Sequence, residues 1–542
     1  MKQIICFCLI LFTLFSLQAQ STKPKLVVGI VVDQMRYEYL NRFEKHYSED
    51  GIKKMINQGF NSKNTHFSYI PTYTAPGHAT VFTGTTPANH GIISNNWYDK
   101  KINKTVYCVE DENTTSIGVD GNGGKMSPHR MLTTTLGDQI RLNTQFRGKS
   151  IGVSLKDRSA VLPAGHSANG AYWFTGGNNG KFISSSFYMD KLPKWVKDFN
   201  KSTEKYIQTW NTLKPIETYI ESDTDLNNYE IGFNGKDNAT FPYDLKALAP
   251  KNDGYDILKD TPFGNDMLTD FAMETIKNEN LGQDEDTDFL AISYSSTDYV
   301  GHNFGVNSKE IQDTYIRLDL NIADLLNFLD ETVGQNNYTL FLTADHGAVH
   351  VPSFLQDQKI PAGYFDNRQL RRSIKEFVEN KFGSAILIEG YSGNEIFFDY
   401  DQLEKEDIEA DDLQEALYYH LIQYEKIDRV YTRDMIEFSH SNSAFDQSVK
   451  NGFHPKRSGD VIYILEPSVI SRGSRKGTTH GSYFSYDTQA PLLFYGNGIN
   501  NGESYKPSYI KDIAPTIAAM LGIAEPNGTT GQIIEEVISK DK

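Results

Sequence analysis

The run Lys25-Leu-Val-Val-Gly-Ile-Val-Val-Asp33 is the stretch that decides the fold of this 542-residue chain. It is continuously apolar and rich in β-branched residues, without the polar alternation of a strand that has one solvent-facing side. Such a run is typical of a parallel strand that is buried on both faces. Asp33 follows the last apolar residue, at the edge of the sheet where parallel strands present their functional groups.

Strand-like and helix-like segments alternate along the rest of the chain. Further strands are predicted at 150–155, 288–294, 338–343, 460–465 and 491–495, and helices up to Met55, at 308–333 and at 509–521. The helix at 308–333 has apolar residues at alternating spacings of four and three. This order predicts an α/β fold with a doubly wound, mostly parallel sheet between two layers of helices.

Two stretches interrupt the alternation. Residues from about 176 to 262 are rich in Asn, Gly, Lys and Asp, and we interpret them as an inserted cap segment. A set of surface loops and helices is the alternative for this stretch. Residues from about 365 to 431 mix strand and helix patterns, which indicates a small α+β insertion. We therefore expect residues 21–542 to form one large domain with two insertions.

Residues 1–20 have the features of a secretory signal peptide. Lys2 supplies the positive end, residues 4–17 the apolar run, and Ala19 a small residue near the cleavage point. The apolar run is shorter than a membrane span, and no cysteine follows it to carry a lipid. We expect a periplasmic or secreted protein without a membrane anchor, in which Cys108 is the only cysteine left and no intramolecular disulfide forms.

The composition excludes some classes of protein. A hydrophobic share of 39% excludes a disordered chain, and a net charge of −17 argues against a nucleic-acid partner. The same charge would repel a small anionic substrate unless the site carried its own cations.

Several predicted strand ends carry residues that bind divalent metal ions. These candidate ligands are Asp33, Asp298, His302, Asp345, His346 and His480. A set of carboxylates and imidazoles favours zinc, and manganese or another divalent ion is a less favoured alternative. Six ligands are enough for two ions. Singly, each residue could be a helix cap, a surface pair or part of a turn. We interpret the other histidines singled out, His78, His90, His166 and His350, as packing or supporting groups.

The segment Pro71-Thr-Tyr-Thr-Ala-Pro-Gly-His-Ala-Thr80 presents a candidate nucleophile, Thr74. The hydroxyl could cap a helix, Pro76 fits a first helical turn, and Gly77 allows another group to come close. A threonine attacks only beside a strong base or a metal ion. An ordinary helix start is the alternative.

Together these motifs resemble the alkaline phosphatase superfamily, most of all the PafA-type phosphate-insensitive bacterial alkaline phosphatases, which are related to nucleotide pyrophosphatases/phosphodiesterases. Asn95, in Gly91-Ile-Ile-Ser-Asn-Asn-Trp, matches the family asparagine that holds a phosphoryl oxygen. Lys156 and Arg158, in Ser-Leu-Lys-Asp-Arg-Ser, match the Lys-x-Arg pair of the monoesterases. The resemblance implies two zinc sites, one formed by Asp298, His302 and His480 and the other by Asp33, Asp345 and His346.

The expected function is a phosphomonoester hydrolase that acts through a phosphothreonine at Thr74 and binds small-molecule phosphomonoesters, with a monomer favoured. Two divalent ions exceed the charge of three aspartates, so the pocket would be cationic within an acidic protein. Lys156 and Arg158 would address oxygens that are anionic only in a monoester. A phosphodiesterase or nucleotide pyrophosphatase is the main alternative. A sulfatase lacks support, because the Cys/Ser-x-Pro-x-Arg pattern is missing, and a non-catalytic binding module is the rival from another class.

Overall fold

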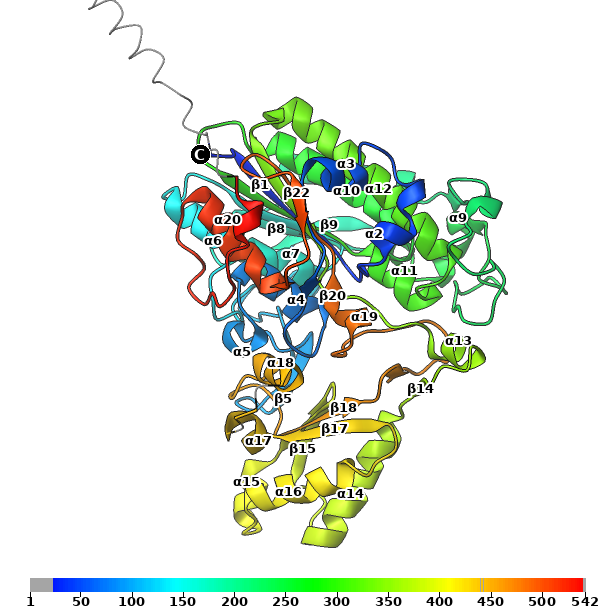
Figure 1. Ribbon diagram of the computed structural model, residues 1–542, viewed down its shortest axis with the longest axis vertical. Coiled ribbons are helices and arrows are strands. Elements are labelled where there is room, and N and C mark those ends of the chain that lie inside the picture. The colour runs from blue at the N-terminus through cyan, green and yellow to red at the C-terminus, as the bar shows by residue number, and fades with distance from the viewer. Residues whose placement is uncertain (1–22, 439, 442, 540–542) are drawn as a thin grey trace, which may run out of the picture.

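A computed structural model of the chain describes residues 23–438, 440–441 and 443–539. The predicted signal peptide at 1–20 lies outside the described residues. Figure 1 shows a large body with a smaller lobe that projects from its lower end. Among the described residues, no helix combines the length and the apolar composition that crossing a membrane requires.

A ten-stranded sheet forms the centre of the body, and it confirms the predicted fold class. Its five central strands are parallel and lie in the order β13 (Tyr338–Thr343), β1 (Leu26–Val32), β12 (Asp288–Tyr294), β7 (Ser150–Ser154) and β8 (Gly170–Thr175). β1 is buried along its whole length, as its unbroken apolar run predicts. Antiparallel strands β21 (Leu492–Gly496) and β9 (Lys181–Ser185) flank this parallel core. β2 (Phe60–Ser62), β22 (Gly502–Ser504) and β6 (Ser116–Ile117) complete the two edges.

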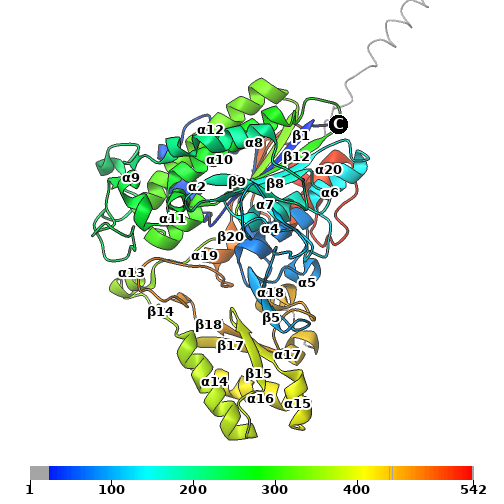
Figure 2. The same ribbon diagram turned by 180° about the vertical axis from the view of Figure 1, so that it is seen from behind.

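Helices cover both faces of this sheet (Figures 1 and 2). One layer contains α4 (Thr74–Thr83), α6 (Leu136–Asn143), α7 (Asp157–Ala164) and α20 (Ile513–Leu521). The other contains α3 (Ile52–Gln58), α10 (Pro262–Asn278) and α12 (Lys309–Leu329). α12 confirms the helix predicted from the apolar stripe, and the Ser308 hydroxyl caps it by accepting from the Ile311 N–H at 3.1 Å.

The stretch from 176 to 262 is anchored in the body. β9 belongs to the main sheet, and the short hairpin of β10 (Thr209–Trp210) and β11 (Tyr243–Asp244) packs beside α12. The buried indole of Trp210 donates to Asp313 of α12 at 2.7 Å. Aromatic residues that are scattered in this sequence therefore meet in the core of the body.

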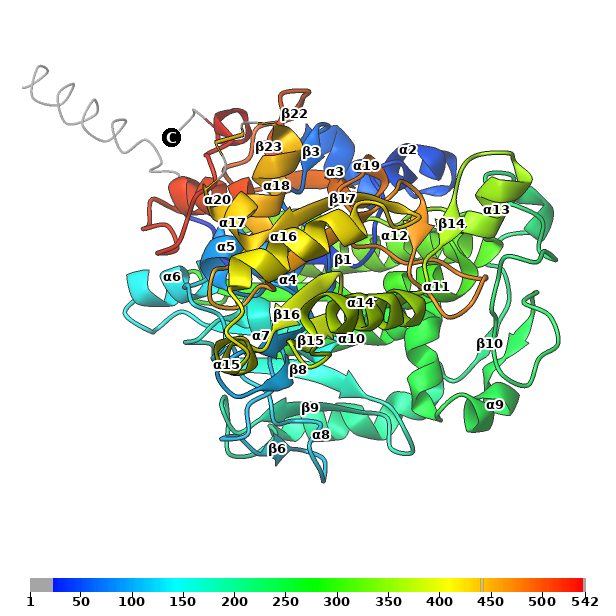
Figure 3. The same ribbon diagram turned by 90° about the horizontal axis from the view of Figure 1, so that it is seen from below.

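The lobe is built on its own antiparallel sheet, in the order β15 (Ile388–Ser392), β16 (Glu395–Phe398), β18 (Val461–Leu465) and β17 (Ile427–Thr432). Helices α14 (Asn367–Phe382) and α16 (Ala410–Leu421) pack on it, in front of the body in Figure 3. The chain enters and leaves through the strand pair β14 (Gly363–Tyr364) and β19 (Val469–Ile470). The strand predicted at 460–465 is thus part of the lobe and not of the main sheet. Apolar periodicity identifies a strand but not the sheet that it joins.

Gly29 at the centre of β1 provides a test of this packing. A Cβ there would lie 2.7 Å from Phe341 Cζ and 2.8 Å from Phe82 Cε1, two ring tips that meet over the strand. We expect Gly29→Ala to lower the free energy of unfolding by about 1–3 kcal/mol, because the overpacked rings must shift. Thermal unfolding measures the effect. Gly473→Ala is the control, since a Cβ at that exposed position meets nothing within 4 Å. Equal losses in the two variants would contradict the prediction.

Candidate active site

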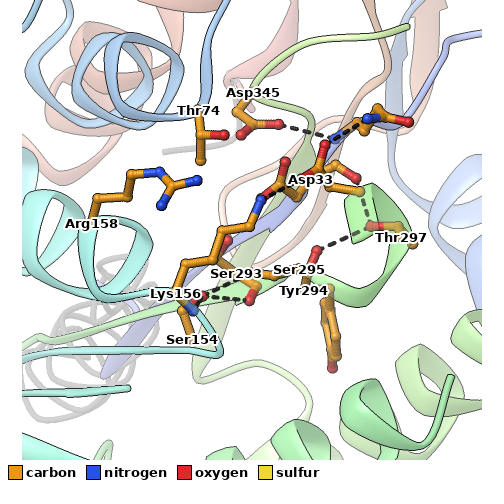
Figure 4. Close-up of polar contacts among 12 residues, drawn as sticks. Asp33, Thr74, Ser154, Lys156, Arg158, Ser293, Tyr294, Ser295, Thr297 and Asp345 are labelled. Carbon is orange, nitrogen blue, oxygen red and sulfur yellow. Dashed lines mark hydrogen bonds and ion pairs between the residues drawn. The ribbon is translucent and has the colours of Figure 1, made fainter. Parts of the chain in front are cut away.

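Three buried aspartates meet at the carboxyl edge of the main sheet. Asp33, Asp298 and Asp345 follow β1, β12 and β13, which are neighbours in the sheet, and their exposed fractions are 0, 3 and 0%. Figure 4 shows Asp33 and Asp345 close together at these strand ends. Burial, followed by the charges of Asp298 and Asp345, raises the pKa of Asp33 well above its usual range. The group therefore requires nearby positive charge to remain ionised.

Each of the three predicted histidine ligands lies with its Nδ1 against a backbone carbonyl. The distances are 2.8 Å from His302 to Thr478 O, 2.8 Å from His480 to Thr72 O, and 3.0 Å from His346 to Gly347 O. When Nδ1 donates its proton there, Nε2 has a free lone pair, which is the usual second-shell arrangement of metal-binding histidines. Burial lowers the pKa of His346 and His480, which favours the neutral form that binds metal.

The ligand atoms form two overlapping clusters. Atoms of Asp33, Asp345 and His346 lie within 4.8 Å of one another, and so do those of Asp298, His346 and His480. The first cluster is one of the predicted zinc sites. In the second cluster, His346 takes the place predicted for His302. His302 itself lies next to this cluster, with its Nε2 at 3.1 Å from Asp298 Oδ1. The rings of His346 and His480 stack with centroids 3.4 Å apart. His346 belongs to both clusters and therefore joins them.

The donor set fits divalent metal ions. Asp33 Oδ1 and Asp345 Oδ2 are buried and have no hydrogen-bond partner among the described residues. Both lie 3.4 Å from His346 Nε2. Buried carboxylate oxygens without partners are costly, and a cation between them would remove that cost. The mixture of carboxylate oxygens and imidazole nitrogens is typical of zinc sites.

Thr74 is the first residue of α4, and its hydroxyl faces the clusters. The N-cap is Tyr73, so Thr74 does not cap the helix as predicted, and its Oγ1 lies 3.4 Å from His346 Nε2. Gly77 brings the helix this close, because a Cβ there would lie 2.7 Å from Asp345 Cβ and collide with the Asp345 carbonyl oxygen. Asn95, just before β4 (Asn96–Asp99), accepts the Ala75 N–H at 2.9 Å and thereby fixes its amide beside Thr74.

Lys156 and Arg158 reach the same region from the start of α7 (Figure 4). Lys156 Nζ lies 2.6 Å from Asp33 Oδ2 and 2.5 Å from Asp298 Oδ2, so it connects the two clusters. The Arg158 Nη1 donates to the Tyr107 hydroxyl at 3.1 Å, and that hydroxyl in turn donates to Asp157. The structure therefore brings together all ten predicted site residues, with Arg158 and Asn95 at the side of Thr74.

Two residues support the clusters: Gln34, which no sequence motif indicates, and His78, which was interpreted as a packing or supporting group. Gln34 has a left-handed backbone (φ 64°); its N–H donates to Asp345 at 3.1 Å and its side-chain amide to Asp298 at 2.5 Å. His78 was expected to pack or support, and its ring contacts Thr74 O (2.8 Å), Ser293 Oγ (2.8 Å) and Asp345 Oδ2 (3.3 Å). His90, His166 and His350 contact Thr80, Asp138 and Arg36 instead.

A cleft between the lobe and the body opens beside Thr74. Two adjoining hollows, of about 570 and 700 Å³, share the residues Ile70, Tyr73, Asn394, Ile464 and Gly481. One hollow extends to Asn96, next to Asn95, and the other is lined by His480. Through His480, the polar clusters therefore adjoin this cleft.

Comparison with known proteins agrees with this geometry. The family described as type I phosphodiesterase / nucleotide pyrophosphatase matches residues 27–487. The chain is 43% identical to alkaline phosphatase PafA of Elizabethkingia meningoseptica over 523 residues, which cover 96% of this chain and 95% of that protein. It is 46% identical over 528 residues, 96% of this chain and 95% of the relative, to a Myroides odoratus protein named a calcium-transporting ATPase.

A solved structure gives the same result. The crystal structure of wild-type alkaline phosphatase PafA superimposes with a TM-score of 0.92 at 42% identity, covering 96% of this chain and all of that one. The resemblance stated from the motifs is thus confirmed. The chain belongs to the type I phosphodiesterase / nucleotide pyrophosphatase family, among relatives that include the PafA alkaline phosphatases.

Proposed function

We propose that this protein is a metal-dependent alkaline phosphatase, which releases inorganic phosphate from small organic phosphomonoesters. The observation that carries the proposal is the position of the Thr74 hydroxyl, 3.4 Å from a histidine shared by two ligand clusters, with Lys156 joining those clusters. Rates on p-nitrophenyl phosphate, its bis-ester and its sulfate, with metal content measured on the same sample, test it. ATP is included as a further substrate, because the Myroides odoratus relative is named a calcium-transporting ATPase.

Two divalent ions, with zinc as the expected metal, would be held by the predicted sets of Asp298, His302 and His480, and of Asp33, Asp345 and His346. When bound, they supply Lewis-acid stabilisation of the attacking and leaving oxygens. Their four positive charges outweigh the three aspartates. An anionic substrate can therefore enter an acidic protein of net charge −17.

The chain's own residues divide the remaining work. Thr74 Oγ loses its proton and forms a bond to phosphorus while the bond from phosphorus to the leaving oxygen breaks. The leaving oxygen takes up a proton, so the products are a phosphothreonine and an alcohol. Water then attacks this ester, releasing phosphate and restoring the threonine. Asn95 and Arg158 would hold oxygens of the transferred group, and Arg158 can bind two at once. Gly77 and Asn95 keep the start of α4 in place.

The same geometry favours monoesters over the diesters of the alternative function. Lys156 and Arg158 provide two cations for the anionic oxygens of the substrate. A diester has one such oxygen fewer than a monoester dianion, so it gains less from the pair. The leaving alcohol would occupy the cleft beside Tyr73. We further propose a periplasmic or secreted monomer, in which residues 21–542 form the catalytic domain after removal of the signal peptide.

Replacement of Thr74 tests the nucleophile. We expect Thr74→Ala to reduce kcat by about a thousandfold or more, because the variant lacks the hydroxyl that lies 3.4 Å from His346 Nε2. Thr74→Ser should retain more activity than Thr74→Ala, since a hydroxyl remains. Metal content and thermal unfolding should stay close to those of the unmodified protein. An alanine variant with most of its activity would show that Thr74 is not the nucleophile.

Removal of metal tests the ligand clusters. We expect chelation to abolish activity and zinc to restore it, with manganese and magnesium as comparison ions. Acidic buffers should also weaken metal binding, because the carboxylates and imidazoles must be deprotonated to act as ligands. Full turnover in a sample shown to be free of metal would exclude the mechanism.

Substrate discrimination tests Lys156 and Arg158. Loss of a charge-assisted partner costs about 2–4 kcal/mol in the transition state, roughly a hundredfold in rate. We expect Lys156→Ala, Arg158→Ala and the double variant to lose more kcat/KM on a monoester than on a diester. The losses need not add, because the two residues share one region. Lys194→Ala is the control, since its side chain is 90% exposed. Equal losses on both substrates would favour the diesterase.

A further inference from the structure

A second group of buried carboxylates lies outside the active site. The segment Asp223-Thr-Asp-Leu-Asn-Asn-Tyr-Glu230 runs past the start of α12, where Glu310 is in the first helical turn. Asp223, Asp225 and Asn227 alternate along it, so that oxygen-bearing side chains recur at every second residue. Asp223 and Glu230 line the same cavity, and burial, followed by the charges of Glu310, Asp225 and Asp223, raises the pKa of Glu230.

Glu230 and Glu310 each have one carboxylate oxygen without a partner. Their exposed fractions are 2% and 0%. Glu230 Oε1 accepts from the Asn227 amide at 2.5 Å, and Glu310 Oε1 accepts from the Tyr243 hydroxyl at 2.5 Å. The Oε2 atom of each is buried and has no hydrogen bond within the described part of the chain. Two unsatisfied carboxylate oxygens in one region are costly without a cation or a proton.

Glu230 faces a small cavity with polar and apolar walls. Its polar lining consists of Asp223, Asn227, Tyr229, Glu230, Asn307 and Ser308, and its apolar lining of Phe304, Val351 and Phe354. The nearest cations form their hydrogen bonds elsewhere: Arg42 donates to the Glu221 carbonyl at 2.9 Å, and Lys309 to the Tyr219 carbonyl at 2.7 Å. Within the described part of the chain, no ion pair involves the four carboxylates, Asp223, Asp225, Glu230 and Glu310.

We propose that this group binds one Ca²⁺ ion, through carboxylates of the 223–230 segment and Glu310. Ca²⁺ accepts six to eight oxygen ligands in flexible geometry, whereas Mg²⁺ requires a compact octahedron. The spacing of Asp223, Asp225 and Asn227 equals that of the first three ligands of an EF-hand loop. The glycine and the closing glutamate of that loop are missing, and Glu230 and Glu310 supply the acidic groups instead. Among the described residues only the active-site clusters have three ligand atoms within 4.8 Å, so binding would draw these carboxylates together.

The position of the segment gives the ion a structural consequence. The Ile231 N–H donates to Asn303 O at 2.8 Å, next to His302, and the Tyr229 carbonyl accepts the Gly477 N–H at 2.7 Å, in the loop that leads to His480. A bound ion would fix the segment that supports both histidines. The proposal does not depend on the phosphatase activity.

Calcium titration of the zinc-loaded, full-length protein tests the proposal. We expect calorimetry to give one Ca²⁺ per chain with little competition from Mg²⁺, and the midpoint of thermal unfolding to rise with Ca²⁺ concentration. Glu230→Gln, which keeps the size of the side chain, should lose Ca²⁺ affinity by about tenfold or more and lose the rise in midpoint. Glu217→Gln, an exposed glutamate of the same region, is the matched control and should behave like the unmodified protein.

The competing arrangement is a proton shared by the two glutamates, because burial raises the pKa of Glu230 to about 10 and that of Glu310 to about 8. It would leave the unfolding midpoint independent of Ca²⁺, and this result would overturn the proposal. Equal Ca²⁺ binding by the unmodified protein and Glu230→Gln would overturn it too, since the ion would then lie elsewhere. If Glu230→Gln fails to fold, Asp223→Asn at a half-buried position gives the same comparison.

Discussion

The rest of the active site depends on the repulsion among three aspartates that β1, β12 and β13 deliver to one buried place. Their carboxylates cannot all remain ionised there without cations, because burial, followed by the charges of Asp298 and Asp345, raises the pKa of Asp33. Lys156 contributes one positive charge between Asp33 and Asp298. The remaining requirement explains why neutral histidines, held by backbone carbonyls, surround the carboxylates and leave their Nε2 atoms free for metal.

Much of this arrangement could be predicted from local sequence. The buried strands and the polar residues at their ends follow from apolar runs and from the rule that parallel strands end at one edge. Gln34 could not be predicted, because its role depends on a left-handed backbone and on contacts with residues more than 260 positions away. The strand predicted at 460–465 belongs to the lobe because it pairs with β16 and β17. The apolar periodicity of a strand does not indicate its pairing partners, so this could not be predicted either.

The lobe is attached at the segments that carry Thr74 and Asn95. The Ile70 N–H donates to Ser448 O at 3.2 Å, four residues before Thr74, and Ser392 donates to Asn96 O at 2.9 Å, one residue after Asn95. The lobe therefore both walls the cleft and fixes the candidate nucleophile from the side opposite the main sheet. A shift of the lobe would move these two groups relative to Asp33 and Asp345, which belong to the body.

The molecule has two clusters of buried carboxylates, one in the active site and one around Glu230, and both require a cation or a proton to offset their negative charge. In the active site, the open oxygens of Asp33 and Asp345 adjoin histidines and Lys156, so nitrogen ligands and a metal such as zinc suit them. Glu230 and Glu310 instead leave carboxylate oxygens open, with no histidine or lysine in the cavity that Glu230 lines, which suits a hard cation such as Ca²⁺. Because the 223–231 segment is hydrogen-bonded beside His302, neutralising the second group also stabilises the wall of the first. The proposed zinc and Ca²⁺ sites would thus place different ions in neighbouring parts of one fold, according to the chemistry of each donor set.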